Sequence, residues 1–171
     1  SYAEEMGVTA AANQVESLVR GAEWLARASR ASGLSQYDTP EHALVRAMGP
    51  ALSFLALEEP PSGGRMADLG AGNGAIGSTI ALLRSDLEVF LVDRAKRAYT
   101  TCEMLVARMG LSNAHPVHAD ATSLGQRYDA VVFRALARGA DALEAARSIT
   151  ASDGLIGAYH SEADAAFEQP G

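Results

Sequence analysis

The sequence predicts an α/β fold: a doubly wound, mostly parallel sheet preceded by an N-terminal helical cap. One observation is a short apolar run, residues 66–69, which stops at a cluster of glycines before residues 76–83 resume with helical spacing. This is the pattern of a strand, a tight turn and the start of a helix. The other is that strand-like and helix-like stretches alternate along the rest of the chain, which is typical of a parallel sheet with helices on both faces.

The first sixty residues are expected to form the cap, as part of the same domain as the core. Apolar residues recur at helical spacing from residue 9 to about residue 32, and Gly33 would end this helix. A second helix is predicted to begin at Thr39-Pro40-Glu41, with Thr39 as N-cap and Pro40 at the first helical position, and to run to about residue 57. A linker rich in Pro and Gly then leads into the core, residues 61–171.

Five strands are predicted in the core. They are residues 66–69, 88–92, 115–118, 130–133 and 155–159, and the helices between them include residues 76–83, 96–109 and 141–148. In doubly wound sheets, ligands bind beyond the carboxyl ends of the strands. Those ends carry Asp68, Asp93, Asp120 and Arg134, which are therefore the candidate site residues.

Composition restricts the class of protein. The chain has 171 residues, 48% hydrophobic and 20% charged, as in a globular domain, and no apolar run reaches the roughly 18 residues that span a bilayer. We therefore expect a cytoplasmic protein that does not bind a membrane. A single cysteine, Cys102, excludes an internal disulfide. No metal site is expected, since His115 and His118 would point to opposite faces of one strand. The net charge of −7 counts against a large nucleic-acid footprint.

The glycine-rich turn predicts a nucleotide-like ligand. Gly70, Gly72 and Gly74 lack a Cβ, so the backbone can adopt positive φ and a ligand can lie against it at a helix N-terminus. Asp68, two residues earlier, would sit poorly beside a pyrophosphate but suits the cationic amino group of S-adenosylmethionine. The pattern therefore favours S-adenosylmethionine over NAD, with Asn73 as a further contact within the turn. The alternative is a turn that is only structural.

The other strand ends can complete such a site. Asp93 lies 23 residues after Gly70, near the spacing at which an acidic residue accepts hydrogen bonds from ribose hydroxyls. Asp120, followed by the pair Ala121-Thr122, can take the adenine amino group and line the purine. Each carboxylate can instead be a solvated charge or a helix cap. Arg134 can hold the cofactor carboxylate, or contact guanine O6 or a phosphate, or form an internal ion pair with Asp68 or Asp120.

Four segments of the core carry a family resemblance. They are Ala67-Asp68-Leu69-Gly70-Ala71-Gly72-Asn73-Gly74, Leu91-Val92-Asp93, Met109-Gly110-Leu111-Ser112-Asn113-Ala114 and Tyr128-Asp129-Ala130-Val131-Val132-Phe133-Arg134-Ala135. In these segments the chain resembles the class I S-adenosylmethionine-dependent methyltransferases, which have a Rossmann-like fold. More narrowly, it resembles the ribosomal RNA small subunit methyltransferase G family, also called glucose-inhibited division protein B. The Arg-Ala pair after the fourth strand is the most specific mark.

The resemblance implies an activity, a partner and contacts. Members of the family methylate N7 of a guanine in small-subunit (16S) ribosomal RNA, and by position their cofactor contacts fall on Gly70, Ala75, the Ala121-Thr122 pair and Arg134. The family's sheet continues through two more strands, which this chain would lack. The residues after the last glycine of the turn, Ala75-Ile76, and the helix before the turn also depart from the family pattern.

The chemistry of guanine N7 fits the residues available. N7 has a free lone pair and no proton to lose, so alignment with the methyl group is the main requirement and no general base is needed. Arg134 would then act by positioning. Cys102 lies on the apolar face of a helix, which favours an inert core residue over a nucleophile. A small-molecule methyltransferase and a catalytically inactive cofactor-binding homologue are the alternatives. The sequence does not predict an oligomeric state.

Overall fold

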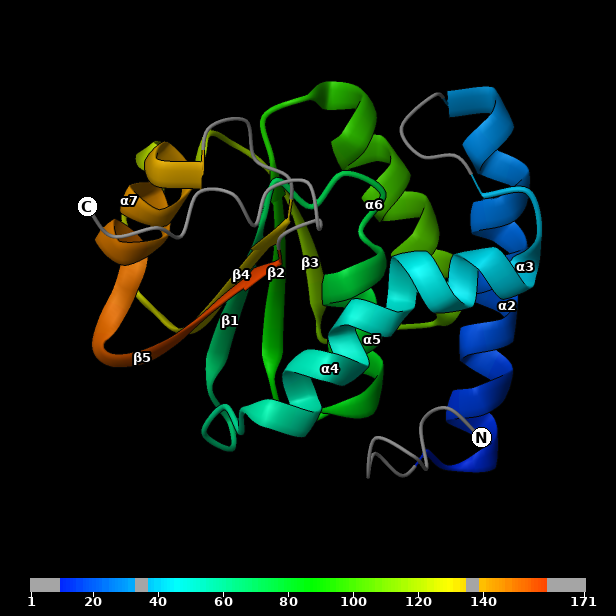
Figure 1. The fold of residues 1–171 in the computed structure, drawn as a ribbon, viewed down its shortest axis with the longest axis horizontal. Helices are drawn as coiled ribbons and strands as arrows, with labels where there is room; N and C mark the ends of the chain where they lie inside the picture. Colours follow the sequence, from blue (N-terminus) through cyan, green and yellow to red (C-terminus); the bar gives the residue numbers. More distant parts are fainter. Residues whose placement is uncertain (1–9, 33–36, 135–138, 160–171) are drawn as a thin grey trace, which may run out of the picture.

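The computed structural model describes residues 10–32, 37–134 and 139–159 (Figure 1). The helical elements are α2 (Ala12–Ser32), α3 (Pro40–His42), the π-helix η1 (Ala43–Met48), α4 (Gly49–Leu57), α5 (Ala75–Leu83), α6 (Lys96–Met109), the 3-10 helix η2 (Ala121–Ser123) and α7 (Gly139–Ile149). The strands are β1 (Arg65–Leu69), β2 (Glu88–Asp93), β3 (Ala114–His118), β4 (Tyr128–Arg134) and β5 (Thr150–Tyr159).

The strands form one parallel sheet in the order β3-β2-β1-β4-β5. The chain builds outward from β1 to β3 and then returns to place β4 on the other side of β1. This reversal makes a crevice at the carboxyl ends of β1 and β4, where doubly wound sheets bind ligands. The predicted fold class, a doubly wound parallel sheet with an N-terminal helical segment, is confirmed.

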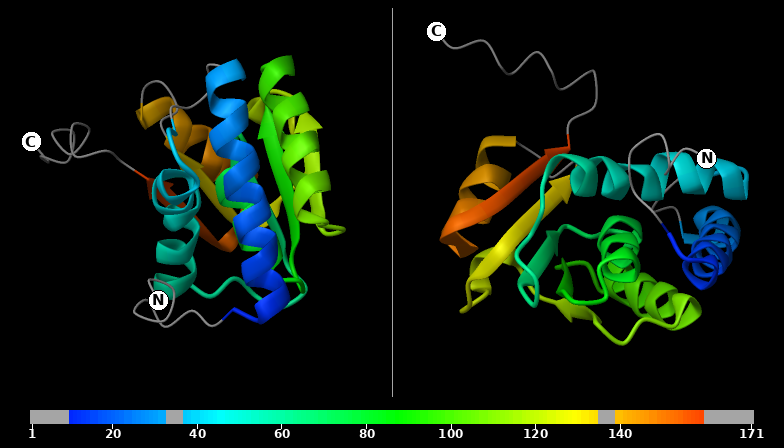
Figure 2. Two further views of the ribbon diagram at one scale, coloured as in Figure 1. Left: turned by 90° about the vertical axis from the view of Figure 1, so that its right-hand side faces the viewer. Right: turned by 90° about the horizontal axis from the view of Figure 1, so that it is seen from below.

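Helices cover both faces of the sheet, as Figure 1 and the views of Figure 2 show. Side chains alternate along each strand, so β1 gives Met66 to the face under α4, α5 and α6, and Ala67 to the face under α7. On the first face Ile80 of α5 and Cys102 of α6 are fully buried, and on the second face Ala146 of α7 is fully buried. Burial on both faces explains why the central strands are almost continuously apolar.

The cap consists of α2, α3, η1 and α4. Thr39 is the predicted N-cap, with Oγ1 accepting a hydrogen bond from the His42 amide at 3.2 Å. The expected single helix up to residue 57 is instead interrupted by η1, in which the Gly49 amide donates to the Leu44 carbonyl five residues earlier. Pro50 is the local reason, because a proline has no N–H with which to continue an α-helical ladder.

Element ends agree with the expectation within a few residues, except at β5. This strand begins at Thr150 and not at residue 155, because Thr150 pairs with Tyr128 before an irregularity that precedes the pairing of Leu155 with Ala130. Gly33 as a helix end, Ala135 of the Arg-Ala pair and the expected absence of two further strands concern parts of the chain outside the described residues.

Candidate active site

The glycine turn has the backbone that the sequence predicts. Gly70, Gly72 and Gly74 have φ angles of 65°, 59° and 76°, in the left-handed region that disfavours side chains. A Cβ on Gly74 would also lie 3.0 Å from the sulfur of Cys102 on α6. The glycine turn therefore packs directly against α6, and the start of α5 lies at the crevice. Cys102 is fully buried and burial raises the pKa of its thiol far above the usual value, as expected for a core residue.

Asp68 is the buried charge of the site. Its side chain on β1 is only 2% exposed, and Oδ2 accepts a hydrogen bond from the Gly77 amide in α5 at 2.8 Å. Burial raises the pKa of Asp68 to about 7, against the lowering effects of the Gly77 N–H and the charge of Arg134, while Asp93 raises it further. A cation bound beside Asp68 would favour the ionised carboxylate and so lower this pKa.

Gly77 is a residue whose role the sequence reasoning missed. A Cβ at this position would lie 3.0 Å from Asp68 Oδ2 and 2.8 Å from a methyl of Leu91. The missing side chain is what lets the α5 backbone reach the Asp68 carboxylate. The signal was the third glycine of the Gly72-x-Gly74-x-x-Gly77 string, whose spacing places it one turn into the helix.

Asp93 ties the end of β2 to the glycine turn. Oδ2 accepts from the Gly72 amide at 2.9 Å and Oδ1 accepts from the Ala95 amide at 2.8 Å. Each carboxylate oxygen can accept more than one hydrogen bond, so both keep capacity for a ribose hydroxyl. Asp93 lies at the carboxyl edge of the sheet, as predicted.

Asp120 is the N-cap of η2, which was the alternative interpretation. Its Oδ1 accepts from the amide and the hydroxyl of Thr122, at 3.0 and 2.7 Å, and these bonds lower the pKa of the Asp120 carboxyl. Asp120 nevertheless lines the crevice, and its hydrogen bonds to Thr122 hold the Ala121-Thr122 segment along it.

Two adjoining cavities occupy the crevice. The smaller, of about 200 Å³, is lined by Asp68, Gly70, Ala71, Gly72, Asn73, Ile76 and Arg134. The larger, of about 440 Å³, is lined by Gly70, Val92, Asp93, Arg94, Ala119, Asp120, Ala121, Thr122, Arg134, Asp141, Ala142 and Ala145. They share Gly70 and Arg134. The structure thus brings nine of the eleven predicted site residues to one crevice, while Gly74 and Ala75 are buried beneath it and line neither cavity.

Arg134 stands where the two cavities meet. Its Nη1 donates a hydrogen bond to the backbone carbonyl of Arg46 in the cap, at 2.9 Å. Its charge also lowers the pKa of Asp68. A second contact from the cap is the Tyr37 hydroxyl, 3.4 Å from the Asn73 amide nitrogen. Neither cap contact was expected from the sequence, because no local pattern joins residues so far apart in the chain.

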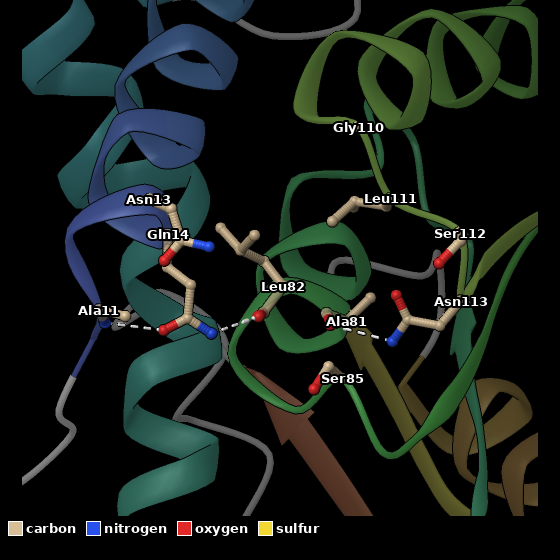
Figure 3. Close-up of a pocket in the computed structure, with 10 residues that line it drawn as sticks. All are labelled: Ala11, Asn13, Gln14, Ala81, Leu82, Ser85, Gly110, Leu111, Ser112 and Asn113. Atoms are coloured by element: carbon tan, nitrogen blue, oxygen red, sulfur yellow. Dashed lines mark hydrogen bonds between the residues drawn. The ribbon is translucent and has the colours of Figure 1, made fainter.

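A third cavity is lined by residues that precede β2 and β3, at the amino ends of these strands (Figure 3). It has about 360 Å³ and lies between the start of α2, the end of α5 and the segment after α6. Gln14 accepts from the Ala11 amide and donates to the Leu82 carbonyl, while the Asn113 amide donates to the Ala81, Arg84 and Leu87 carbonyls. These amides connect backbone segments, which is a structural role.

The described residues contain no group of three or more His, Cys, Asp or Glu side chains arranged to hold a metal ion. His115 is engaged with the Glu88 carboxylate. Within the described ranges, no helix has both the length and the apolar character needed to cross a membrane.

Comparison with known proteins decides the family. Residues 14–168 match the family model of the rRNA small subunit methyltransferase G. The chain belongs to this family. It is 30% identical over 151 residues to the ribosomal RNA small subunit methyltransferase G of Chromohalobacter salexigens, covering 88% of this chain and 71% of that protein. It is 26% identical over 141 residues to the protein of the same name from Desulfitobacterium hafniense, covering 79% of this chain.

The fold is also shared with a solved structure. An S-adenosylmethionine-dependent methyltransferase from Thiobacillus denitrificans, in complex with S-adenosylhomocysteine, aligns with a TM-score of 0.54 at 17% identity, covering 63% of this chain and 46% of that one. The predicted family and the Rossmann-like fold are therefore confirmed. The chain spans 58% of the length of the Desulfitobacterium relative.

Proposed function

We propose that this protein transfers a methyl group from S-adenosylmethionine to N7 of a guanine in small-subunit ribosomal RNA. The observation that carries the proposal is Asp68, a buried carboxylate that lines a cavity beside a glycine turn at the switch point of the sheet. A dinucleotide would bring a pyrophosphate to this turn, and the carboxylate would repel it. A cationic amino group gives the same carboxylate a partner.

The two cavities suit different parts of the cofactor. The methionine part belongs in the smaller one, where Asp68 faces the ammonium group and Arg134 offers a forked donor to the carboxylate. The adenosine belongs in the larger one, with Asp93 accepting from the ribose hydroxyls and Asp120, Ala121 and Thr122 along the adenine. When bound, the cofactor supplies an electrophilic methyl group on a sulfonium.

The residues of the chain would then have to orient guanine N7 toward the methyl group and exclude water from the site. Methylation of N7 would use its free lone pair and transfer no proton, so no residue would have to act as a general acid or base. Among the described residues, the carboxyl end of β4 matches this requirement, since it offers Arg134 as a positioning donor and no carboxylate or imidazole. Alignment in a site that excludes water is the main contribution expected.

Calorimetric titration with S-adenosylhomocysteine tests the cofactor. We expect binding by the native chain, and a loss of about 1 to 3 kcal/mol in Asp93→Ala, because a ribose acceptor is removed. Asp86→Ala is the matched control: this carboxylate pairs with Arg84 at 2.8 Å before β2 and lines neither cavity of the crevice. No binding by the native chain would refute the cofactor assignment.

Methyl transfer to small ribosomal subunits that lack the modification tests the substrate. We expect incorporation into the RNA, and cleavage chemistry selective for 7-methylguanine should place the methyl group. Incorporation into free metabolites and not into subunits would support a small-molecule methyltransferase, an outcome that the net charge of −7 favours. Cofactor binding without turnover on either substrate would support an inactive homologue.

A further inference from the structure

Two hydrogen bonds attach the carboxyl ends of β4 and β5 to the helical cap. Arg134 Nη1 donates to the Arg46 carbonyl at 2.9 Å, and the Tyr159 hydroxyl donates to the Pro50 carbonyl at 2.8 Å. Arg134 and Tyr159 are partners in the register of the two strands. Arg46 and Pro50 are four residues apart, so their positions are neighbours on one face of a helix. The sheet edge therefore contacts one turn of the cap at two adjacent carbonyls.

Pro50 makes one of these carbonyls available. In an α-helix the carbonyl of Arg46 would accept from the amide of residue 50, four residues later. Residue 50 is a proline and has no amide hydrogen. The π-helix η1 ends with the bond from the Gly49 amide to the Leu44 carbonyl, and the α-helical register resumes in α4, which contains Pro50. The Arg46 carbonyl is thus left without its α-helical donor at the point where the Arg134 guanidinium approaches.

We propose that Pro50 is a positioning residue of the cofactor site, because it reserves the Arg46 carbonyl for Arg134. The guanidinium held in this way lines both cavities, so its direction decides whether it faces the cofactor carboxylate. The Tyr159 hydroxyl fixes the same turn from the neighbouring strand. This inference rests on the proposed function, since its consequence is measured as affinity for the cofactor.

The test is a double-mutant cycle on the full chain, read as affinity for S-adenosylhomocysteine. In Pro50→Ala the new amide competes with Arg134 for the Arg46 carbonyl, and we expect affinity to fall about fivefold. Arg134→Met should lose about tenfold or more, because a charged donor to the cofactor is removed. The double variant should be no weaker than Arg134→Met alone. Pro40→Ala, a proline replaced at the start of α3, is the matched control and should stay within twofold of native.

Two results would overturn the proposal. One is an affinity of Pro50→Ala within twofold of native. The other is an equal loss from Pro50→Ala in the native and Arg134→Met backgrounds, since this would indicate a general effect on the cap. Titration of the native chain with S-adenosylhomocysteine separates failure of this proposal from failure of the proposed function: if the native chain does not bind, the proposed function itself is refuted. The side-chain 15N spectrum is a readout that needs no cofactor. The guanidinium signals of Arg134 are identified by their absence from the spectrum of Arg134→Met. These signals should shift in Pro50→Ala and keep their positions in Pro40→Ala.

Discussion

Binding of S-adenosylhomocysteine should depend on pH through Asp68. Burial raises the pKa of this carboxyl to about 7 in the free protein. The ligand ammonium favours the ionised carboxylate, so binding must remove the proton wherever the free protein carries it. With a pKa of about 7, roughly three-quarters of Asp68 is ionised at pH 7.5 and roughly 3% at pH 5.5. Affinity should therefore fall about 25-fold between these two values.

Calorimetry measures this effect in two ways. The dissociation constant between pH 5.5 and 7.5 gives the fold-change, and the binding enthalpy in buffers of different ionisation enthalpy gives the number of protons released, which should approach one at pH 6. Asp68→Asn is the control: it keeps an oxygen for the Gly77 amide, cannot ionise, and should bind weakly with no pH dependence in this range. Affinity of the native chain that is constant from pH 5.5 to 7.5 would refute the reasoning.

Three further predictions concern stability, each measured by urea unfolding. The pKa of Asp68 is raised from 3.8 to about 7 in the folded chain, so the protonated Asp68 favours folding most below pH 4 and this contribution is lost as the pH rises through 7. Asp68→Asn should therefore stabilise the free chain at pH 8 by up to about 4 kcal/mol. Equal stability of the variant and the native chain at pH 8 would contradict this. Gly77→Ala should cost about 1 to 3 kcal/mol through contact with Asp68, whereas Gly125→Ala, which meets nothing within 4 Å, should be near neutral. Thr79→Val should gain about 1 kcal/mol, because the buried Thr79 hydroxyl has no partner among the described residues, and a loss would indicate such a partner.

The elements of the core could be predicted because their signals are local. The helix over residues 96–109 is found as α6, since its apolar spacing and Gly110, with φ of 71°, both lie within the segment. The start of β5 was missed for the opposite reason. Residues 151–154 contain Ser, Asp and Gly and indicate a turn, while the pairing of Thr150 with Tyr128 depends on a strand more than twenty residues earlier.

The candidate site divides in the same way. Asp68 and the glycines follow from spacing along one strand and one turn, and Asp93 from its position at the end of the next strand. The hydrogen bond from Arg134 to Arg46 joins residues 88 apart, and no periodicity encodes it. Its one local signal was Pro50 within an otherwise helical segment, which indicates a free carbonyl four residues earlier but does not say which donor will use it.

In the proposed cofactor site, the cap supplies the carbonyl that holds Arg134. Ala47 and Met48 of η1 pack in one cluster with Ala75 at the start of α5 and Met109 at the end of α6. In α2, a Cβ on Gly21 would lie 2.9 Å from the sulfur of Met109, so these helices are closely packed. Movement of the cap would displace the Arg46 carbonyl and, with it, the guanidinium of Arg134.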